Sequence, residues 1–299
     1  MVYTEIKERN GKKYFYRVIN SRKGKKFNKK RVYLGVDLNK HNLAVEESKA
    51  DKELMLLSTL LNEQEKNELE SIKKLFLSEP KTNFENRYES FISLFTYDST
   101  NIEGNTLTLQ ETSQLLFENI TPRKSLREIN EVINHKKAFD FILEDKKDIS
   151  KELILQLHKL IVQNTLRPEL ENQIGKYRTL QVYIRGTQWF PPKPEEVSGE
   201  MASLLNWYAK NKDSLHPLIL AAYFHSAFET IHPFVDGNGR AGRMLMNLIL
   251  HNHNYPMINI PHKKKHIYYK SLEDSQIKGN LRPLVKFLFD LVKEGRIRF

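Results

Sequence analysis

The chain of 299 residues contains no cysteine. Disulfides, zinc–thiolate sites and cysteine nucleophiles are therefore excluded, and the composition fits a reducing compartment, so we expect a cytoplasmic protein. Long apolar runs are also missing: the best of them, residues 218–224, is far too short to span a bilayer, which predicts a soluble chain with no membrane partner. The first residues are polar and lack a signal-peptide pattern. A Walker-type phosphate loop, an internal repeat and a low-complexity tract are absent too.

Positive charge is concentrated at the N-terminus. The net charge is +11, yet residues 1–40 hold 13 Lys and Arg against 3 Asp and Glu, and the remaining residues hold 35 against 34. A basic segment of this kind could bind nucleic acid or an acidic partner, and it could equally be a solvated lysine-rich hairpin. Both interpretations stay open. With 39% hydrophobic residues, the rest of the chain can bury one substantial core.

Hydrophobic periodicity predicts a mainly α-helical fold. Residues 13–19 and 31–36 are rich in β-branched and aromatic types and flank a turn-like run at 20–25, so a small antiparallel sheet is expected at the N-terminus. Within 175–192 the pattern predicts a β-hairpin closed by prolines. Apolar residues at helical spacing, together with capping signals, predict helices over residues 52–76, 84–103, 109–118, 126–145, 150–163, 195–211, 215–231, 239–251 and 282–294.

These elements suggest three regions along the chain. They are a small basic β-sheet region at residues 1–45, a helical region at 46–149 and a helical core at 150–294. The helices at 52–76 and 84–103 each carry an apolar stripe that needs a covering surface. If no other part of the chain covers these stripes, a homodimer is expected.

One stretch of twelve residues concentrates the chain's chemical groups. A helix that begins near its Gly239 would direct unpaired N–H groups into the preceding loop, and the glycines let a ligand approach the backbone, so an anion site suited to phosphate is predicted. Arg240 and Arg243 lie at i and i+3 and can bind the same polyphosphate. The full stretch reads His232-Pro233-Phe234-Val235-Asp236-Gly237-Asn238-Gly239-Arg240-Ala241-Gly242-Arg243.

Two further groups in this stretch point to catalysis. Asp236 would repel a phosphate unless Mg²⁺ lay between them, so it is the candidate metal ligand. His232 can act as a general base near neutral pH, and Pro233 is expected to hold it in an extended conformation. Phe234 is expected to pin the loop against the core.

The stretch resembles, without gap or substitution, the signature His-Pro-Phe-x-Asp-Gly-Asn-Gly-Arg-x-x-Arg of Fic-domain proteins. The resemblance covers about residues 83–294 and implies a Fic-type helical core that transfers AMP from ATP to a Ser, Thr or Tyr hydroxyl of a target protein. His232 would deprotonate that hydroxyl and Asp236 would hold Mg²⁺. The phosphates of ATP would be bound by the other signature residues, with the last of them at the γ-phosphate: Gly237, Asn238, Gly239, Arg240, Gly242 and Arg243.

The same resemblance assigns two neighbouring segments. The hairpin expected at residues 177–190 is similar to the family's flap, which aligns the target by strand addition, so its central residues are the candidate target-binding residues: Val182, Tyr183 and Ile184. Tyr269 lies in a segment similar to the one that packs near the adenine, and is a candidate nucleotide-binding residue. The chain departs from the family at Gln276, where relatives often carry Asn.

Glu103 ends a predicted helix, where a carboxylate is disfavoured by about 0.3–1 kcal/mol because it faces the negative end of the helix dipole. On spacing alone it is an ordinary exposed residue. However, Ser99-x-x-x-Glu103-Gly104 resembles the inhibitory motif [Ser/Thr]-x-x-x-Glu-[Gly/Asn] of Fic proteins, whose Glu pairs with the second signature arginine, here Arg243. The resemblance implies autoinhibition by a helix at about 84–104. It also leaves open that the chain removes AMP from targets and modifies itself.

Alternatives to protein AMP transfer remain. The loop could transfer another phosphate-containing group or use another nucleotide, because it recognises phosphates rather than bases. A non-catalytic, nucleotide-sensing protein whose basic N-terminal region binds nucleic acid or a partner is the other alternative. Three smaller expectations concern residues outside the stretch: His225 is packed or hydrogen bonded, residues 262–266 form a solvated basic loop, and Trp189 and Phe190 anchor the hairpin. Nothing in the sequence names the target protein.

Overall fold

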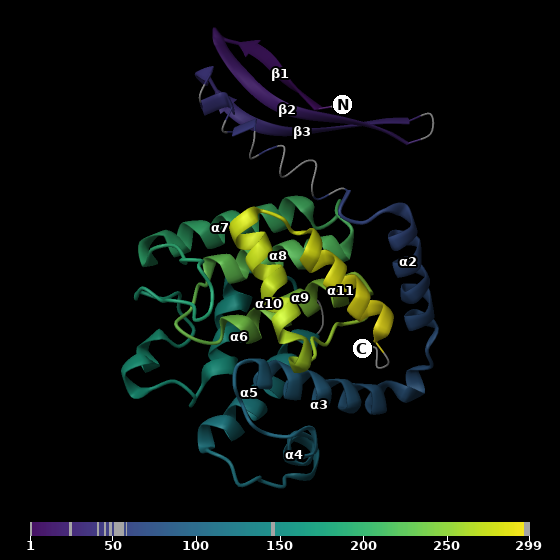
Figure 1. Cartoon of the computed structure of the whole chain (residues 1–299), viewed down its shortest axis with the longest axis vertical. Coiled ribbons are helices and arrows are strands. Elements are labelled where there is room, and N and C mark those ends of the chain that lie inside the picture. The colour runs from purple at the N-terminus through teal and green to yellow at the C-terminus, as the bar shows by residue number, and fades with distance from the viewer. Residues whose placement is uncertain are drawn as a thin grey trace. The chain divides into compact units, whose positions relative to one another are not determined.

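The computed structural model describes residues 2–23, 26–40, 42–44, 46, 47, 50, 57, 59–144 and 147–295. The chain divides into two compact units, residues 1–62 and 63–299. Figure 1 shows the sheet of the first unit and the helices of the second. The predicted boundary at residue 150 falls inside the second unit and stays a prediction.

The first unit contains an antiparallel sheet in the order β1-β2-β3. Its strands are β1 (Val2–Arg9), β2 (Lys12–Lys23) and β3 (Lys26–Val36). The prediction of β2 and β3 is confirmed, whereas β1 was missed because charged residues interrupt its apolar pattern. Phe15 and Leu34 form a small core with Ala50, and Leu43 packs against it, so helical residues after β3 cover one face of the sheet.

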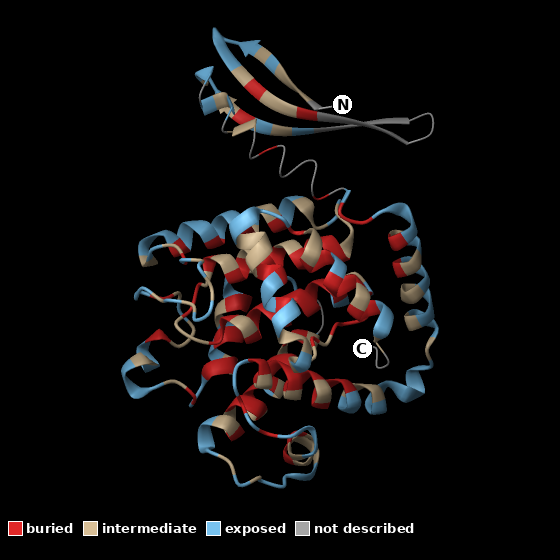
Figure 2. Cartoon of the chain, viewed as in Figure 1, coloured by how far each residue is buried: buried red, intermediate tan, exposed pale blue. Residues whose placement is uncertain are grey.

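The second unit is built around α8 (Pro217–Ile231) and α9 (Asn238–Asn252). Most residues of both helices are buried, as Figure 2 shows, because their sequences are apolar or small on most sides. Six longer helices surround the pair: α3 (Phe84–Ile102), α5 (Leu126–Leu143), α6 (Lys151–Val162), α7 (Pro194–Asn211), α10 (Lys265–Lys278) and α11 (Arg282–Glu294). Shorter elements connect them: η1 (Lys81–Asn83), α4 (Leu109–Ser113), η2 (Gln114–Glu118), η3 (Pro168–Gln173) and η4 (His262–Lys264).

The helix predicted at residues 52–76 differs in the structure. Helix α2 spans Glu63–Ser78, and the chain is not helical at residues 60–62. Residues 52–56 and 58, which belong to the prediction, lie outside the described part of the chain. The apolar stripe of α3 is covered within the chain, because the rings of Phe91 and Phe95 pack against Phe139 of α5. The α3 stripe therefore no longer supports a homodimer, which stays a prediction.

The β-hairpin predicted at residues 177–190 was wrong in its pairing. The segment is an irregular loop with a turn at Arg185 and Gly186, and no strand ladder forms between its two arms. Pro191 and Pro192 lack the N–H groups that a ladder would need at its base. Trp189 does anchor the loop, since its Nε1 donates to the carbonyl of Thr230 at 2.9 Å. Phe190, predicted as a second anchor, is 72% exposed.

Helix α10 was not predicted, and the solvated loop expected at residues 262–266 was wrong. These residues form η4 and the first turn of α10. The Nδ1 atom of His262 lies 2.7 Å from Oδ1 of Asp98, a buried carboxylate on α3. The lysine-rich start and the weak apolar periodicity of α10 hid this helix from sequence patterns. Within the described residues, none of the helices is both long and apolar enough to cross a membrane.

Both predicted capping boxes are present, and one of them gives a stability test. Ser125 accepts the N–H of Glu128, while the Glu128 carboxylate accepts the N–H of Ser125. We expect Ser125→Ala to lower the free energy of unfolding at pH 7 by about 1 kcal/mol, measured by urea denaturation, because the start of α5 loses its cap. Ser71→Ala, in the middle of α2, should change it far less, and equal effects of the two substitutions would contradict the capping role.

Candidate active site

The loop between α8 and α9 begins with a residue in a rare conformation. His232 closes α8 with φ +50° and ψ +62°, and its N–H donates to the carbonyl of Phe228 at 2.9 Å. The expectation that Pro233 holds His232 extended was therefore wrong. A left-handed conformation at a residue other than glycine is strained, so it persists only where surrounding contacts enforce it.

Arg178 supplies those contacts. Its side chain is 2% exposed, and its Nε donates to the carbonyl of His232 at 2.8 Å, while its backbone N–H donates to Pro233 at 2.8 Å. The same guanidinium also binds the carbonyls of Leu180 and Pro192, the two ends of the irregular loop. Burial lowers the pKa of Arg178, but a guanidinium stays charged. One cation therefore fixes both segments, a role that sequence patterns did not reveal.

Phe234 pins the loop as expected. It is fully buried and stacks on the imidazole of His158, with ring centroids 3.8 Å apart. Nδ1 of His158 accepts the N–H of Gly175 at 3.0 Å, so Nε2 must carry the proton that it shares with the carbonyl of Asp236 at 3.2 Å. Burial lowers the pKa of His158 to about 4, which keeps this tautomer neutral. Asn238 completes the loop by bonding both the N–H and the carbonyl of Phe234.

The N-terminus of α9 has the geometry on which the prediction of an anion site rests. Gly237 has φ +80°, a conformation open to glycine, and turns the chain into the helix. The N–H groups of Asn238, Gly239 and Arg240 then point out of the first turn without partners inside the helix. A carboxylate already lies there: a Cβ atom on Gly239 would collide with Oε1 of Glu103.

Glu103 pairs with Arg243 at this site. Oε1 of Glu103 lies 2.7 Å from Nη2 of Arg243, and Ser99 binds the same guanidinium through its hydroxyl at 3.0 Å and its carbonyl at 2.9 Å. Arg243 is 1% exposed and Glu103 33%. Although burial alone would lower it, the Glu103 carboxylate raises the pKa of Arg243. The contact between Glu103 and Arg243 that the resemblance implies is thus present, although the two residues lie 140 positions apart in sequence.

Asp236 faces two guanidiniums. Its Oδ1 lies 3.1 Å from Nη2 of Arg240, and its Oδ2 lies 3.4 Å from Nη2 of Arg127. Among the described residues, no group of three acidic, His or Cys side chains could hold a metal ion. A single carboxylate still fits Mg²⁺ when phosphates and water supply the other ligands, which is the usual way that Mg²⁺ binds in nucleotide sites. Nε of Arg240 is buried and, within the described residues, has no hydrogen-bond partner, so it can serve an incoming phosphate.

Glu229 lies beside the imidazole of His232 and was not identified from the sequence. Its Oε2 is 3.8 Å from Nδ1 of His232, whose side chain keeps 21% exposure. Burial raises the pKa of Glu229 to about 8 and lowers the pKa of His232 to about 4. Near pH 7 the carboxyl is therefore largely protonated and the imidazole neutral, able to accept a proton. A lone acidic residue in an apolar helix was the signal that could have found it.

Gly242, predicted to bind phosphate, lies elsewhere. A Cβ atom at this position would collide with Oε1 of Glu229 and Nδ1 of His225, so the missing side chain lets α9 approach α8. His225 is buried, and its Nε2 lies 2.6 Å from the hydroxyl of Tyr268, which confirms that it is packed and hydrogen bonded.

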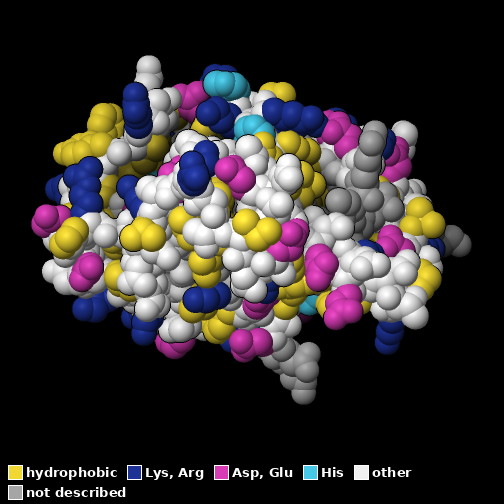
Figure 3. Space-filling model, turned by 90° about the horizontal axis from the view of Figure 1, so that it is seen from below, with side chains coloured by type: hydrophobic (Ala, Val, Ile, Leu, Met, Phe, Trp, Pro, Cys, Tyr) yellow, Lys and Arg dark blue, Asp and Glu magenta, His cyan; other side chains and the backbone are white. Residues whose placement is uncertain are grey.

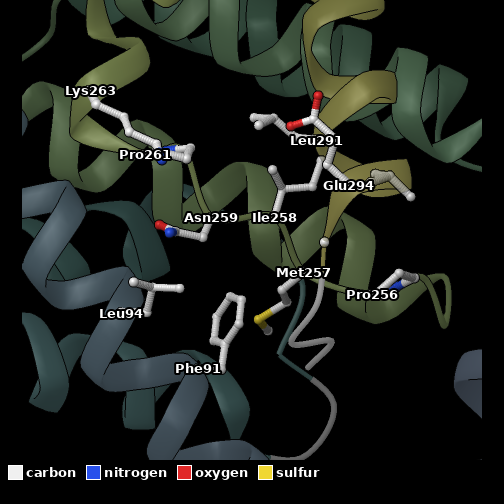
Figure 4. Close-up of a pocket in the computed structure, with 12 residues that line it drawn as sticks. Phe91, Leu94, Pro256, Met257, Ile258, Asn259, Pro261, Lys263, Leu291 and Glu294 are labelled. Carbon is white, nitrogen blue, oxygen red and sulfur yellow. The ribbon is translucent and has the colours of Figure 1, made fainter.

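Two of the cavities in this unit can be compared with the position of the site. One, of about 380 Å³, borders Glu229 and is walled by residues 184–187 of the irregular loop and by α10, including Tyr269 and Gln276. Another, of about 340 Å³, is lined by Phe91 and Leu94 of α3, by residues after α9 and by α11 (Figure 4). None of the signature residues lines either cavity, but the first is bordered by Glu229, which lies beside His232, whereas the second is lined by no residue of the candidate site.

Residues 148–250 match the Fic/DOC family. The chain is 36% identical over 203 residues to Protein adenylyltransferase Fic of Drosophila persimilis, a match that covers 66% of this chain and 39% of that protein. A crystal structure of a Fic-domain signaling protein from Bacteroides thetaiotaomicron superposes with a TM-score of 0.69 at 27% identity, covering 77% of this chain and 94% of that one. Residues 148–250 of the chain form a Fic/DOC domain.

Further Fic relatives agree with this assignment. Protein adenylyltransferase fic-1 of Caenorhabditis briggsae is 35% identical over 202 residues, covering 65% of this chain and 38% of that protein. Fic-1 from C. elegans superposes with a TM-score of 0.69 at 27% identity, covering 86% of this chain and 76% of that one. The chain spans about two fifths of the length of the fly and nematode adenylyltransferases.

Within this Fic fold the predicted site residues fall into three groups. Those of the signature loop other than Gly242 gather at the start of α9, where Ser99 and Glu103 bind Arg243. Tyr269 and Ile184 lie on the wall of the 380 Å³ cavity. Tyr183, 76% exposed, and Val182 lie on the irregular loop outside it. The contribution of each of these residues to function stays a prediction.

The high pKa of Glu229 leads to a pH test. Between pH 4.5 and about 8, Glu229 is protonated in the folded chain and ionised in the unfolded chain. The free energy of unfolding therefore declines as pH rises through that range. We expect Glu229→Gln, which resembles the protonated acid, to match the wild type near pH 5 and to become more stable than it by pH 8. Thermal unfolding at both pH values measures this. A constant difference between the two proteins would refute the raised pKa.

Proposed function

We propose that the chain is a protein adenylyltransferase that transfers AMP from ATP to a Ser, Thr or Tyr hydroxyl of a target protein, and that its own Glu103 holds it inactive. The observation that carries the proposal is the ion pair of Glu103 with Arg243 at the start of α9, in a chain whose relatives are named protein adenylyltransferases. A carboxylate occupies the place where the nucleotide's anionic end would bind.

His232 would act as the general base. Its neutral imidazole takes the proton of the target hydroxyl, whose oxygen forms a bond to the α-phosphorus of ATP. The bond from that phosphorus to the bridging β-phosphate oxygen breaks, and pyrophosphate leaves. The low pKa of His232 makes it a weak base in the free chain. Negative charge on a bound triphosphate would raise that pKa towards neutrality and strengthen the base.

Phosphate binding would fall to the start of α9. The N–H groups of Asn238, Gly239 and Arg240 would donate to phosphate oxygens, with the guanidiniums of Arg240 and Arg243 on either side. The side chain of Asn238 is already engaged by Phe234, so this residue would contribute its backbone. The nucleoside would lie in the 380 Å³ cavity beside Tyr269.

Glu103 would inhibit by charge and by position. A guanidinium bound by a carboxylate cannot also bind the γ-phosphate, and the carboxylate repels that phosphate across a short distance of low dielectric. ATP would then bind weakly or with its phosphates misplaced.

Asp236 would hold Mg²⁺ together with the phosphates. When bound, the ion neutralises phosphate charge and screens the Asp236 carboxylate from it. The guanidiniums of Arg127 and Arg240 also neutralise the charge of Asp236. These two ion pairs would keep the carboxylate in place before Mg²⁺ binds.

Removing the carboxylate should release activity. We expect Glu103→Gly to raise incorporation of label from ATP labelled at the α-phosphate, including self-modification, by at least about tenfold, because Arg243 becomes available to the γ-phosphate. Adding His232→Ala to that variant should abolish labelling. The measurement is gel autoradiography with equal protein in each lane.

Glu144→Gly is the matched control, because Glu144 also caps a helix, α5, and pairs with Lys147, which lies at the far end of α9 from Arg243. It should label like the wild type. Equal labelling of wild type and Glu103→Gly would contradict the inhibitory role of Glu103. If another nucleoside triphosphate gave labelling and ATP gave none, the proposed site would stand and ATP would be the wrong substrate.

The role of Asp236 can be measured by binding alone. In the Glu103→Gly background, Mg²⁺ should tighten ATP binding, and adding Asp236→Asn should remove most of that gain. In EDTA the order should reverse, because the uncharged side chain no longer repels phosphate. Calorimetric titrations with and without Mg²⁺ test this, and an unchanged Mg²⁺ effect in Asp236→Asn would reject Asp236 as the ligand.

A further inference from the structure

The basic charge of the chain lies in its N-terminal sheet. Residues 1–40 carry an excess of 10 positive charges, while the rest of the chain carries an excess of 1. Figure 3 shows a face of the helical unit on which Lys and Arg side chains are interspersed with Asp and Glu. The attraction of this protein for a polyanion is therefore concentrated in the first unit.

The pairing register sorts the sheet into two faces, because directly opposite residues of antiparallel strands point the same way. Phe15, Arg17 and Val32 share one face, on which Leu43, Glu47 and Ala50 lie. Tyr14, Tyr16 and Val18 share the other. Leu43, Glu47 and Ala50 therefore lie against the first face, and the second face carries a different set of side chains.

The second face carries a tyrosine cluster. Tyr16 lies opposite Tyr33 with ring centroids 5.4 Å apart, and Tyr14 lies 6.5 Å from Tyr33. Tyr33 is 53% exposed, although tyrosine usually buries most of its ring. Val18 belongs to the same face and is fully buried.

Cations border the rings on the same face. Lys7 pairs with Tyr14, and its Nζ lies 5.7 Å from the centroid of Tyr16. Arg9 and Lys12 pair with each other at the end of the hairpin and are both exposed. The one acidic residue of this face in β1 is Glu5, and Nε of Arg31 binds it at 2.7 Å. The face therefore offers aromatic rings and positive charge with its carboxylate neutralised.

We infer that this face binds single-stranded nucleic acid. Bases would stack on Tyr14, Tyr16 and Tyr33, and the phosphates between them would contact Lys7, Arg9 and Lys12. Stacking needs bases that are free of a duplex, and exposed rings on an antiparallel sheet among cations are the arrangement that accepts them. An acidic peptide would use the cations and leave the rings without a function. Neither sugar is read by a stacked ring, so RNA and DNA strands both fit.

The test uses the full chain and fluorescein-labelled oligomers of dT and rU, followed by fluorescence anisotropy. We expect both strands to bind, with affinity falling as salt rises at a logarithmic slope of about −2 or steeper for three phosphate contacts. Tyr33→Phe keeps a ring and should bind like the wild type. Tyr33→Leu keeps an apolar side chain but loses the ring, and should bind at least about fivefold more weakly.

Charge variants give a second, independent measurement. Lys7→Gln, Arg9→Gln and Lys12→Gln should each make the salt slope shallower by about 0.7. Lys13→Gln is the matched control, because Lys13 pairs with Glu8 on the opposite face, and it should leave the slope nearly unchanged.

Three results would overturn the inference: equal binding by Tyr33→Leu and Tyr33→Phe, competition by poly-glutamate as effective as by unlabelled oligomer, or duplex DNA bound as tightly as the single strand. Far-UV circular dichroism of each variant shows that the sheet is retained. His232→Ala should bind the oligomers like the wild type, so failure of this inference and failure of AMP transfer remain distinguishable.

Discussion

A guanidinium buried in the helical unit sets the requirements for the residues around it. Arg243 carries a permanent charge with 1% exposure, so a folded state without an anion beside it is disfavoured. In the described structure that anion is Glu103, assisted by Ser99. A phosphate can satisfy the same requirement. The proposed resting and active states therefore differ in which anion faces Arg243. The equilibrium between them depends on the difference between two strong interactions, that of Arg243 with Glu103 and that of Arg243 with a phosphate.

Much of this arrangement could be predicted from the sequence. The ends of α8 and α9 follow from apolar periodicity and glycines, and the boxes at Ser125 and Thr108 follow from capping chemistry. The pairing of Glu103 with Arg243 was implied by the family resemblance alone, since nothing in local spacing connects residues so far apart. Short-range rules recovered the helices, and the motif supplied their long-range contact.

The features that could not be predicted depend on contacts that leave no periodic pattern in the sequence. Arg178 acts by binding carbonyls, which any residue supplies, so its partners leave no mark in the pattern. Glu229 was hidden in an apolar helix, and its raised pKa arises from burial that only the fold creates. The left-handed His232 shows tertiary contacts overriding the local preference expected before proline. At residues 177–190 the β-rich composition was real, but a ladder also needs partners in register.

The guanidinium of Arg178 has a mechanical consequence. It joins the carbonyl of His232 to those of Leu180 and Pro192, so both ends of the irregular loop and the peptide of the proposed base form one rigid frame. The ends of the loop cannot separate without releasing His232, whereas the tip at Arg185 and Gly186 lies outside these hydrogen bonds. A polypeptide held at that tip would be presented at a nearly constant height above the imidazole. A loop held in this way would accept varied side chains in the bound segment. It would reject segments in which the hydroxyl is shifted by one residue, because the hydroxyl would then not reach the imidazole of His232.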